Sequence, residues 1–382
     1  MRPTGTTETW LTHPTLNWED TKETAPRTND EGKNISSPSQ LLGDETTLFV
    51  MQLLMFYVTP AISVLGALGN VFSIIILVKH GLDKCSNILL FCLAVTDLTF
   101  LISFNSVPKV LYEVTGEPFA WAYSESASCA AFVMFIIFNI LDYAMGYISL
   151  TIPMLITIER LIAVFMPLKF HQIMTPKRTW GMVGVTYCFW YSYNIYSSFW
   201  FEFGYEFRPH LNISVGLIQR SPLYYRELNA VSFMQEFVTY SSMKIPPVCT
   251  LLGCIIISAK IRMASVKRKK LTSAGGKRES SSSSSSTRTT KMLLAVCAVY
   301  TVTCAILSLP TYIPQYAYYT LTGDAPNNVG RIAYQLMNII VCVNSSCNFV
   351  VYVGMNKKFR DTYKSLLCCS CRYAKRNQNA RL

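Results

Sequence analysis

The chain has 382 residues, of which 51% are hydrophobic and only 15% are charged. Soluble domains usually carry about 25% charged residues, so this composition argues against a surface that is exposed to water throughout. The formal net charge of +12 suits either nucleic acid or the anionic face of a membrane, and the placement of the basic residues decides between them.

The chain starts with a polar segment, residues 1–48, which is rich in threonine, asparagine and proline. Such a segment cannot bury enough apolar surface to fold, so we expect it to be disordered. We see no cleavable signal peptide in it. We therefore expect the first apolar helix to direct insertion into the membrane.

Seven long apolar segments follow. A membrane-spanning helix needs about 20 mostly apolar residues, and these runs are too long and too irregular for alternating β-strands. The sequence therefore predicts an all-α membrane protein with a seven-transmembrane helix bundle over residues 49–354. Of the two long connections, 202–230 and 263–290, we expect the second to be a flexible, serine-rich third cytoplasmic loop. The predicted spans are 49–79, 86–111, 129–165, 179–201, 231–262, 291–319 and 331–354.

Basic residues gather in alternate connections between these spans. The loops at 79–85 and 166–178, the stretch from Lys260 to Lys291 and the tail from Lys357 onward contain 23 of the 34 lysines and arginines. The positive-inside rule makes that side of the bundle cytoplasmic. The N-terminus is then extracellular and the C-terminus cytoplasmic, and the positive charge faces the lipid bilayer rather than nucleic acid. Asn34 and Asn212, each in an Asn-x-Ser sequon on the outer side, are the candidate glycosylation sites.

Ionisable residues inside the predicted spans require a reason, because a charge at the bilayer centre costs at least about 2.5–3.5 kcal/mol. Asp97 lies in the second span, and Asp142 and Arg160 lie in the third. The 18 residues between Asp142 and Arg160 make five helical turns, and Ser149 lies about 20° off the same line. These side chains therefore share one face of the third helix, which we expect to point into the bundle.

A second polar stripe follows the seventh span. Asn344, Asn348 and Tyr352 are spaced by four residues, so they also lie on one helix face. Polar stripes within a membrane face the bundle interior. The alternative, that such groups only hold helices together, stays open for Ser149.

Short motifs run through these spans in a characteristic order. They are Gly69-Asn70, Leu93–Leu98, Thr157–Val164, Pro167-Leu168, Pro310, Asn344–Tyr352 and Lys357–Arg360. Together they resemble the rhodopsin-like G-protein-coupled receptors, and the resemblance covers residues 49–365. The form of the third-span and seventh-span motifs is similar to that of invertebrate neuropeptide receptors, especially FMRFamide-type receptors.

The resemblance implies a bundle that switches between inactive and active packings when a ligand binds outside. Glu159 is expected to hold Arg160 at rest and to release it toward a heterotrimeric G protein. The sixth helix is expected to swing outward near Pro310, where a backbone hydrogen bond is missing, while Tyr352 rotates inward. The cytoplasmic partners implied are the G protein and arrestin.

The resemblance also implies a sodium ion at Asp97 in the resting state, and we expect no other cofactor. Asn70 is expected to brace Asp97 from the first span. The polar pocket around the ion is expected to comprise Asp97, Ser149, Asn344, Ser345 and Asn348.

The tail, residues 355–382, is expected to begin with a short amphipathic eighth helix that opens at Lys357. Three cysteines follow this helix near the membrane, and we predict that they are palmitoylated. These are Cys368, Cys369 and Cys371. The other cysteines are scattered singly without zinc-site spacing, so we expect no further metal site.

The sequence departs from the family pattern in four places. Phe349 and Ser308 stand where the family has a proline and an aromatic switch residue, and Pro153 interrupts the third helix, where we expect a kink. The family also ties the third helix to the second extracellular loop by a disulfide. Cys129 lies about 46 Å from Arg160 along an unbroken helix, and residues 202–230 contain no cysteine, so we predict no such disulfide.

The ligand is expected to bind in the outer part of the bundle, where Asp142 lies about 27 Å from Arg160 along the helix. We predict that Asp142, with Tyr312 and Gln315, contacts a peptide ligand with a cationic group. The aromatic residues of the connection at 202–230 offer either a stacking surface or an interfacial belt.

Several alternatives to a peptide receptor were weighed. A chemosensory or amine receptor for small molecules is the alternative within the same fold. A channel or transporter is the alternative from another class, but the repeats and broken helices that transporters show are absent. No arrangement of catalytic residues is present, so we expect no enzyme.

Overall fold

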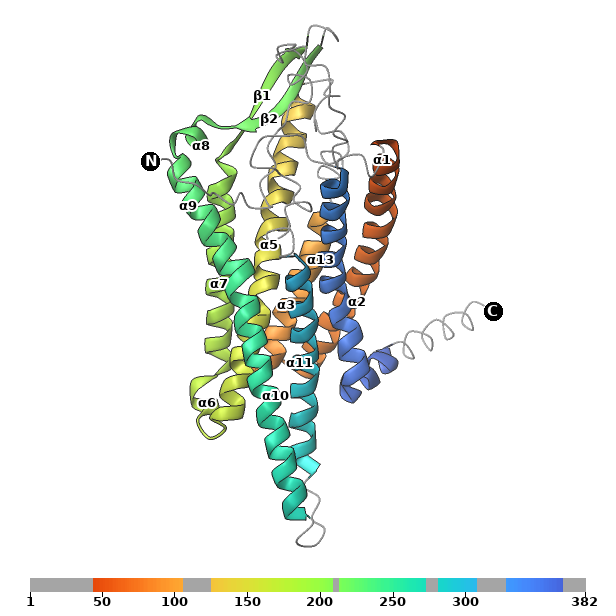
Figure 1. Ribbon diagram of the computed structural model, residues 1–382, viewed down its shortest axis with the longest axis vertical. Coiled ribbons are helices and arrows are strands. Elements are labelled where there is room, and N and C mark those ends of the chain that lie inside the picture. Colours follow the sequence, from red (N-terminus) through yellow and green to blue (C-terminus); the bar gives the residue numbers. More distant parts are fainter. Residues whose placement is uncertain (1–43, 106–124, 209–212, 273–280, 308–327, 367–382) are drawn as a thin grey trace, which may run out of the picture.

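The computed structural model describes residues 44–105, 125–208, 213–272, 281–307 and 328–366. These residues form an elongated bundle whose helices run roughly along one long axis (Figure 1). Five segments within the described residues are long and apolar enough to cross a membrane. With α7 (Pro176–Ser198) and α11 (Ser281–Leu307) beside them, the bundle agrees with the predicted seven-transmembrane architecture.

The first three spans are long helices, and two of them extend beyond their predicted ends. The first span starts at Asp44 rather than residue 49, so the last part of the segment predicted to be disordered is helical. The third continues through Pro153 as one helix of 41 residues. The elements are α1 (Asp44–Leu53), the π-helical turn η2 (Leu54–Val58), α2 (Thr59–His80), α3 (Cys85–Phe104) and α5 (Glu125–Phe165).

The fourth span leads into a β-hairpin that the sequence analysis did not predict. β1 and β2 pair antiparallel, with Phe201 opposite Arg220 and Arg208 opposite Ile213. β1 alternates aromatic residues with glutamate or glycine, the two-residue period of a strand, so the signal was present in the sequence. The elements are α6 (Phe170–Ile173), α7 (Pro176–Ser198), β1 (Phe201–Arg208), β2 (Ile213–Arg220) and α8 (Pro222–Arg226).

The last three spans differ from prediction at the connection 263–290, which was expected to be a flexible loop. Helix covers both ends of the stretch at 263–290, since α10 continues to Thr272 and α11 starts at Ser281. The serine run that we expected to be flexible thus opens a helix. The elements are α9 (Leu228–Val238), the π-helical turn η3 (Thr239–Lys244), α10 (Ile245–Thr272), α11 (Ser281–Leu307) and α13 (Asn328–Met355).

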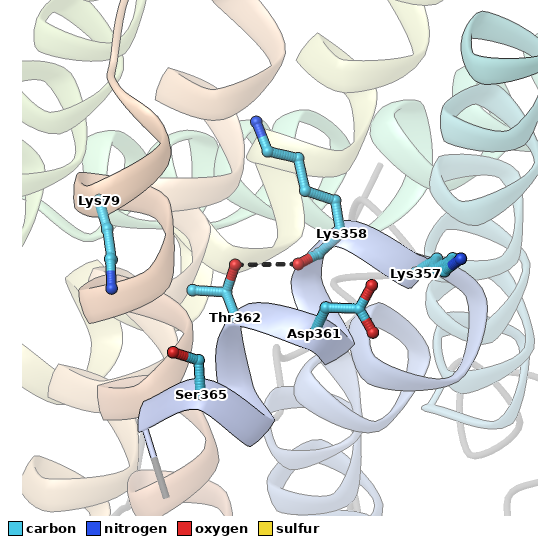
Figure 2. Close-up of a pocket in the computed structure, with 6 residues that line it drawn as sticks. All are labelled: Lys79, Lys357, Lys358, Asp361, Thr362 and Ser365. Atoms are coloured by element: carbon cyan, nitrogen blue, oxygen red, sulfur yellow. Dashed lines mark hydrogen bonds between the residues drawn. The ribbon is translucent and has the colours of Figure 1, made fainter. Parts of the chain in front are cut away.

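The predicted eighth helix is present at 357–366, directly after α13. Its apolar face packs back onto the bundle: the Phe359 ring lies 5.5 Å from that of Tyr352, and the Tyr363 ring lies 5.4 Å from that of Phe72. The Arg360 guanidinium donates to the carbonyl oxygens of Val353 and Gly354, which caps the end of α13. The helix is therefore held against α2 and α13 (Figure 2).

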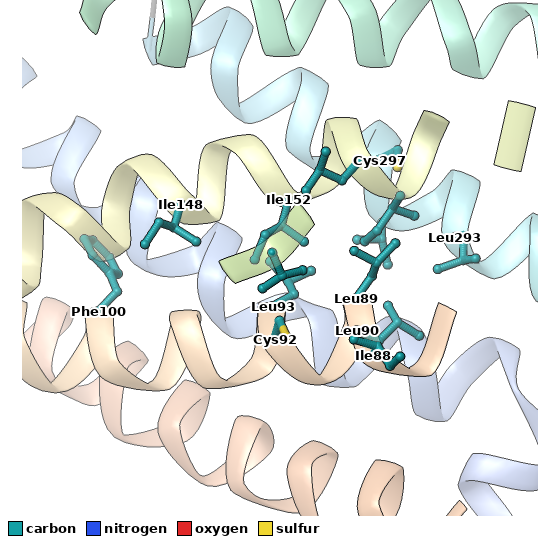
Figure 3. Close-up of a cluster of buried hydrophobic side chains, with 14 of the residues drawn as sticks. Ile88, Leu89, Leu90, Cys92, Leu93, Phe100, Ile148, Ile152, Leu293 and Cys297 are labelled. Atoms are coloured by element: carbon teal, nitrogen blue, oxygen red, sulfur yellow. The ribbon is translucent and has the colours of Figure 1, made fainter. Parts of the chain in front are cut away.

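The core of the bundle lies between α3 and α5 (Figure 3). Leu89, Leu93, Ile148 and Ile152 are all at most 2% exposed, and side chains of α11 close the cluster. Burial from both helices fixes their relative rotation, because each presents one apolar stripe to the other. This rotation sets the directions in which the polar residues of α3 and α5 point.

The first and seventh spans approach closely because α2 places glycines at their contact. A Cβ atom at Gly66 would overlap the Ser346 side chain, and one at Gly69 would lie 2.9 Å from Cβ of Phe349. Small residues allow helix backbones to come together in a membrane. The close approach brings Asn70, next to Gly69, against α13.

We call the end of the bundle that carries β1 and β2 the hairpin end. The end that carries α6 and the helix at 357–366 is the opposite end (Figure 1).

Candidate functional site

The centre of the bundle contains one buried carboxylate that joins three helices. Asp97 on α3 is fully buried, and its two oxygens accept hydrogen bonds from different helices. Ser149 on α5 donates at 2.7 Å to one oxygen, and the Asn348 amide on α13 donates at 2.7 Å to the other. Charge-assisted bonds of this kind are stronger than neutral ones, and both donors were expected members of the pocket.

Asn70 on α2 is also buried, but it bonds differently from the expected brace. Its amide nitrogen donates at 2.9 Å to the backbone carbonyl of Ser345 on α13. Asn70 thus ties α2 to the backbone of α13 rather than holding Asp97 directly. Ser345 and Asn344 are 1% and 8% exposed, so both residues lie in the bundle interior.

The donor set of this pocket suits a hard cation. It offers a carboxylate, hydroxyl groups and amide oxygens, and the amide oxygen of Asn70 is buried without a hydrogen-bond partner among the described residues. Oxygen ligands are those that hard cations prefer. Asp97 is the only acidic member of the expected pocket, so the residues fit an ion of low charge.

A second polar cluster lies toward the opposite end, where α5 meets the start of α3. The Arg160 guanidinium pairs with the neighbouring Glu159 at 2.7 Å, which agrees with the expected resting contact. Ser86 on α3 joins the pair: its hydroxyl donates to Glu159 at 3.1 Å and accepts from Arg160. Sequence reasoning missed Ser86, since a serine at the start of a span carries no signal of its own.

A third contact, between α5 and α11, was also missed. The Tyr300 hydroxyl donates at 2.7 Å to the backbone carbonyl of Leu150, and Tyr300 is 1% exposed. Thr157 lies 3.4 Å from the Cys297 sulfur. Thr157 lies two turns from Leu150 along α5, and Cys297 lies one turn from Tyr300 along α11. Both contacts flank Pro153, whose missing amide proton weakens the hydrogen-bond ladder of α5. The sixth span is therefore fastened to the third where the third is least regular.

Tyr352 has the burial expected of a switch residue. It is 1% exposed, and its ring meets Phe359 of the helix at 357–366. Its hydroxyl group has no hydrogen-bond partner among the described residues. A buried hydroxyl without a partner costs about 1–3 kcal/mol, so a packing that supplies one would be favoured.

Asp142 lies on α5, two helical turns toward the hairpin end from Ser149. Its side chain is 3% exposed, so a carboxyl group is buried between the polar centre and the hairpin. Burial of this kind is costly, and acidic groups within a membrane commonly mark ligand or ion sites. The position agrees with the face predicted from helical spacing.

The hairpin is fastened by aromatic contacts. Phe203 of β1 stacks on Phe132 of α5 with ring centroids 5.2 Å apart. The Arg220 guanidinium lies 4.4 Å from the ring centres of both Phe201 and Tyr224. Cys129, one turn from Phe132, is an exposed free thiol. Stacking thus links the third span to the loop at the level where the family pattern has a disulfide.

The aromatic residues in and next to this connection differ in burial. Trp200 is 2% exposed and packs against Tyr193, Tyr196 and Tyr224, so it belongs to the core. Phe207 and Tyr225, in contrast, are 57% and 62% exposed.

Several predicted residues lie outside the described part of the chain. They are Asn34, Asn212, Ser308, Pro310, Tyr312, Gln315, Cys368, Cys369 and Cys371.

Comparisons with known proteins agree with this arrangement. The family model described as serpentine type 7TM GPCR chemoreceptor Srw matches residues 57–370. The FMRFamide receptor of Drosophila melanogaster is 27% identical over 308 residues, which cover 78% of this chain and 51% of that protein. The chain thus spans about half the length of the curated relative that it matches. The matched family region includes every residue of the polar centre and of the Glu159–Arg160–Ser86 cluster.

Proposed function

The chain belongs to the serpentine type 7TM GPCR chemoreceptor family Srw, and from this premise we propose that it converts binding of an extracellular ligand into activation of a heterotrimeric G protein. As a member of this receptor family it is a multi-pass membrane protein. The family is not a known enzyme class.

We propose that the hairpin end is extracellular and the opposite end cytoplasmic. The opposite end carries Lys79, Lys84, Lys169 and Lys177, and basic residues concentrate on the cytoplasmic side of membrane proteins. The N-terminus is then extracellular and the tail cytoplasmic, where a G protein and arrestin bind.

The observation that carries the proposal is that α5 holds both polar clusters. Ser149 binds Asp97 of α3, and 11 residues further along α5 the Glu159–Arg160 pair binds Ser86 of the same helix. A shift of α5 against α3 therefore changes both clusters together. Such a two-state contact is what an outside ligand needs in order to alter an inside surface.

In the resting packing, Glu159 and Ser86 occupy the polar groups of Arg160 and keep it from a partner protein. Release of this contact frees the guanidinium for the G protein. The Tyr300–Leu150 bond holds α11 on α5 at rest, so α11 has to leave α5 for the cytoplasmic side to open. Pro310 remains our proposed hinge for this movement.

We propose that a sodium ion stabilises the resting packing at Asp97. Asp97 would hold the ion together with oxygens of Ser149, Ser345 and Asn344, and Asn70 would contribute its unpartnered amide oxygen. The ion would neutralise the buried carboxylate and favour the packing in which these helices converge.

For the ligand we propose a neuropeptide with a cationic group. The support is the match to a curated FMRFamide receptor and the buried carboxyl of Asp142 between the polar centre and the hairpin. Tyr312 and Gln315 are the further contacts that we propose from the sequence. The exposed aromatic residues of the hairpin, Tyr205 and Phe207, offer stacking surface for aromatic peptide side chains.

A small-molecule chemoreceptor is the second candidate, since the matching family is described as chemoreceptors. The buried position of Asp142 also suits a small amine. The two candidates differ in whether the hairpin takes part in binding, because only a peptide is large enough to reach from Asp142 to β1.

The test is to express the chain in cells and measure calcium and cyclic-nucleotide responses to amidated peptides, including FMRFamide, and to biogenic amines. A peptide response that Asp142→Asn weakens at least about tenfold supports the proposal, since a lost ion pair in a buried site costs more than about 1.4 kcal/mol. Arg160→Ala at equal surface expression should keep peptide binding and lose signalling. Unchanged potency in Asp142→Asn would exclude the charge pairing, and responses to amines alone would favour the second candidate.

A further inference from the structure

A pocket lined by three lysines lies at the opposite end of the bundle, away from both polar clusters. It has a volume of about 540 Å³ and is formed between the end of α2 and the helix at 357–366. Figure 2 shows its lining residues, which come from both of these elements. They are Lys79, Lys357, Lys358, Asp361, Thr362 and Ser365.

The pocket has an excess of positive charge. Three lysines and one aspartate leave two positive charges among the lining residues, and no carboxylate of the described chain lies within ion-pair distance of the three ammonium groups. Burial lowers the pKa of the His80 ring below its ordinary value, and the nearby charges of Lys358, Lys79 and Lys84 lower it further. The net positive charge of the lining favours an anion that carries more than one negative charge over a singly charged one.

Hydrogen bonds and aromatic contacts hold the helix at 357–366 against α2 around this pocket. The His80 ring nitrogen lies 3.0 Å from the Thr362 hydroxyl, which donates at 2.9 Å to the carbonyl of Lys358. Phe359 and Tyr363 anchor the same helix in the aromatic cluster with α2 and α13. The lysine backbones are therefore positioned before any ligand binds, which lowers the entropic cost of binding.

An apolar ridge leads along α2 to the pocket. Val71 and Ile75 are 40% and 45% exposed. Val71, Ile75 and Lys79 follow one another at intervals of four residues. Residues four apart lie on one face of a helix, so Lys79 lies at the end of an apolar ridge that faces the lipid. Val78, 55% exposed, borders the same ridge. An apolar chain can lie along this ridge while a charged group attached to it enters the pocket.

We propose that this pocket binds the headgroup of a multiply phosphorylated acidic phospholipid, with its acyl chain on the α2 ridge. The three lysine side chains point in different directions (Figure 2), but they are long and flexible, so their ammonium groups can turn toward the phosphate oxygens, and the Ser365 hydroxyl offers a further donor. A headgroup with one negative charge would leave the pocket positive. The placement in the cytoplasmic leaflet rests on the orientation that we proposed above.

The test measures lipid binding to the purified full-length chain by native mass spectrometry. The probes are phosphatidylcholine, phosphatidylserine, phosphatidylinositol 4,5-bisphosphate and the free headgroup inositol 1,4,5-trisphosphate. We expect the bisphosphate lipid to bind best. The triple variant K79Q/K357Q/K358Q should bind it at least about tenfold more weakly, because each lysine near an anionic surface contributes roughly a fivefold gain.

The matched control is K169Q/K177Q/K260Q, which removes three exposed lysines elsewhere on the same side and should leave lipid binding within about twofold. The variant K357Q/K358Q, which leaves α2 intact, serves if the triple variant does not fold. Equal binding by a pocket variant and its control would overturn the proposal. Binding of the free trisphosphate as tight as that of the lipid would overturn the lipid assignment. The assay uses no agonist or G protein. Lipid binding can therefore be detected even if the protein does not respond to any peptide.

Discussion

The Tyr300 hydroxyl of α11 donates a 2.7 Å hydrogen bond to the backbone carbonyl of Leu150 on α5, three residues before Pro153. A side chain of the sixth span thus bonds to the backbone of the third span where the proline weakens it. In the mechanism proposed here, this bond belongs to the resting packing only.

Tyr300→Phe removes the hydroxyl and keeps the ring. We expect basal G-protein signalling to rise about fivefold, because losing one hydrogen bond of about 1 kcal/mol from the resting state shifts the equilibrium by that factor. The measurement is ligand-free cyclic-nucleotide or calcium signalling at matched surface expression. Basal signalling at or below the wild-type level would contradict the proposed role of this bond.

Ser86→Ala removes the hydroxyl that contacts both Glu159 and Arg160. We expect higher basal signalling, and we expect the free energy of unfolding to fall by about 1–2 kcal/mol, seen as a lower thermal midpoint, since two buried charged groups lose a partner. Ser103→Ala on the same helix is the control, because among the described residues the Ser103 hydroxyl bonds only to the carbonyl of Thr99 within α3. If both variants behave alike, Ser86 has no special part in holding Arg160.

Asp97→Asn tests the sodium proposal. In the wild type, raising sodium chloride should weaken agonist binding, while the same concentration of potassium chloride should not. The variant should lose this difference, because it lacks the charge that holds the ion, although Ser149 and Asn348 remain beside it. Equal sodium effects in both proteins would show that the ion, if bound, lies elsewhere.

Phe132 and Phe203 join the third span to the hairpin through stacked rings 5.2 Å apart. Their alanine variants, alone and together, should show a coupling free energy of about 0.5–1.5 kcal/mol in thermal unfolding. Hydrogen exchange of β1 should also accelerate in either variant. Phe207→Ala, at a position 57% exposed, is the control and should leave both readouts unchanged. Additive effects of the two alanines would mean that the stack does not hold the hairpin.

Helical spacing in the sequence was sufficient to place Asp142, Ser149 and Arg160 on one face of the third helix, and Asn344, Asn348 and Tyr352 on one face of the seventh. The structure buries all six, as expected. This succeeded because an apolar solvent forces polar groups inward, so the periodicity of a single helix decides its interior face. The family resemblance added the Glu159–Arg160 contact, which the structure also contains.

Partners on other helices depended on tertiary packing. Ser86, Tyr300 and the redirected bond of Asn70 follow from the rotation and depth of neighbouring helices, which many side chains decide together. The strand alternation from Phe201 to Arg208 is visible in the sequence but does not predict a hairpin by itself, because the pairing with β2 depends on residues outside the strand. The sequence by itself determined which residues avoid lipid; only the tertiary structure decided which of them meet, because contact distances depend on packing between helices rather than on the period within one.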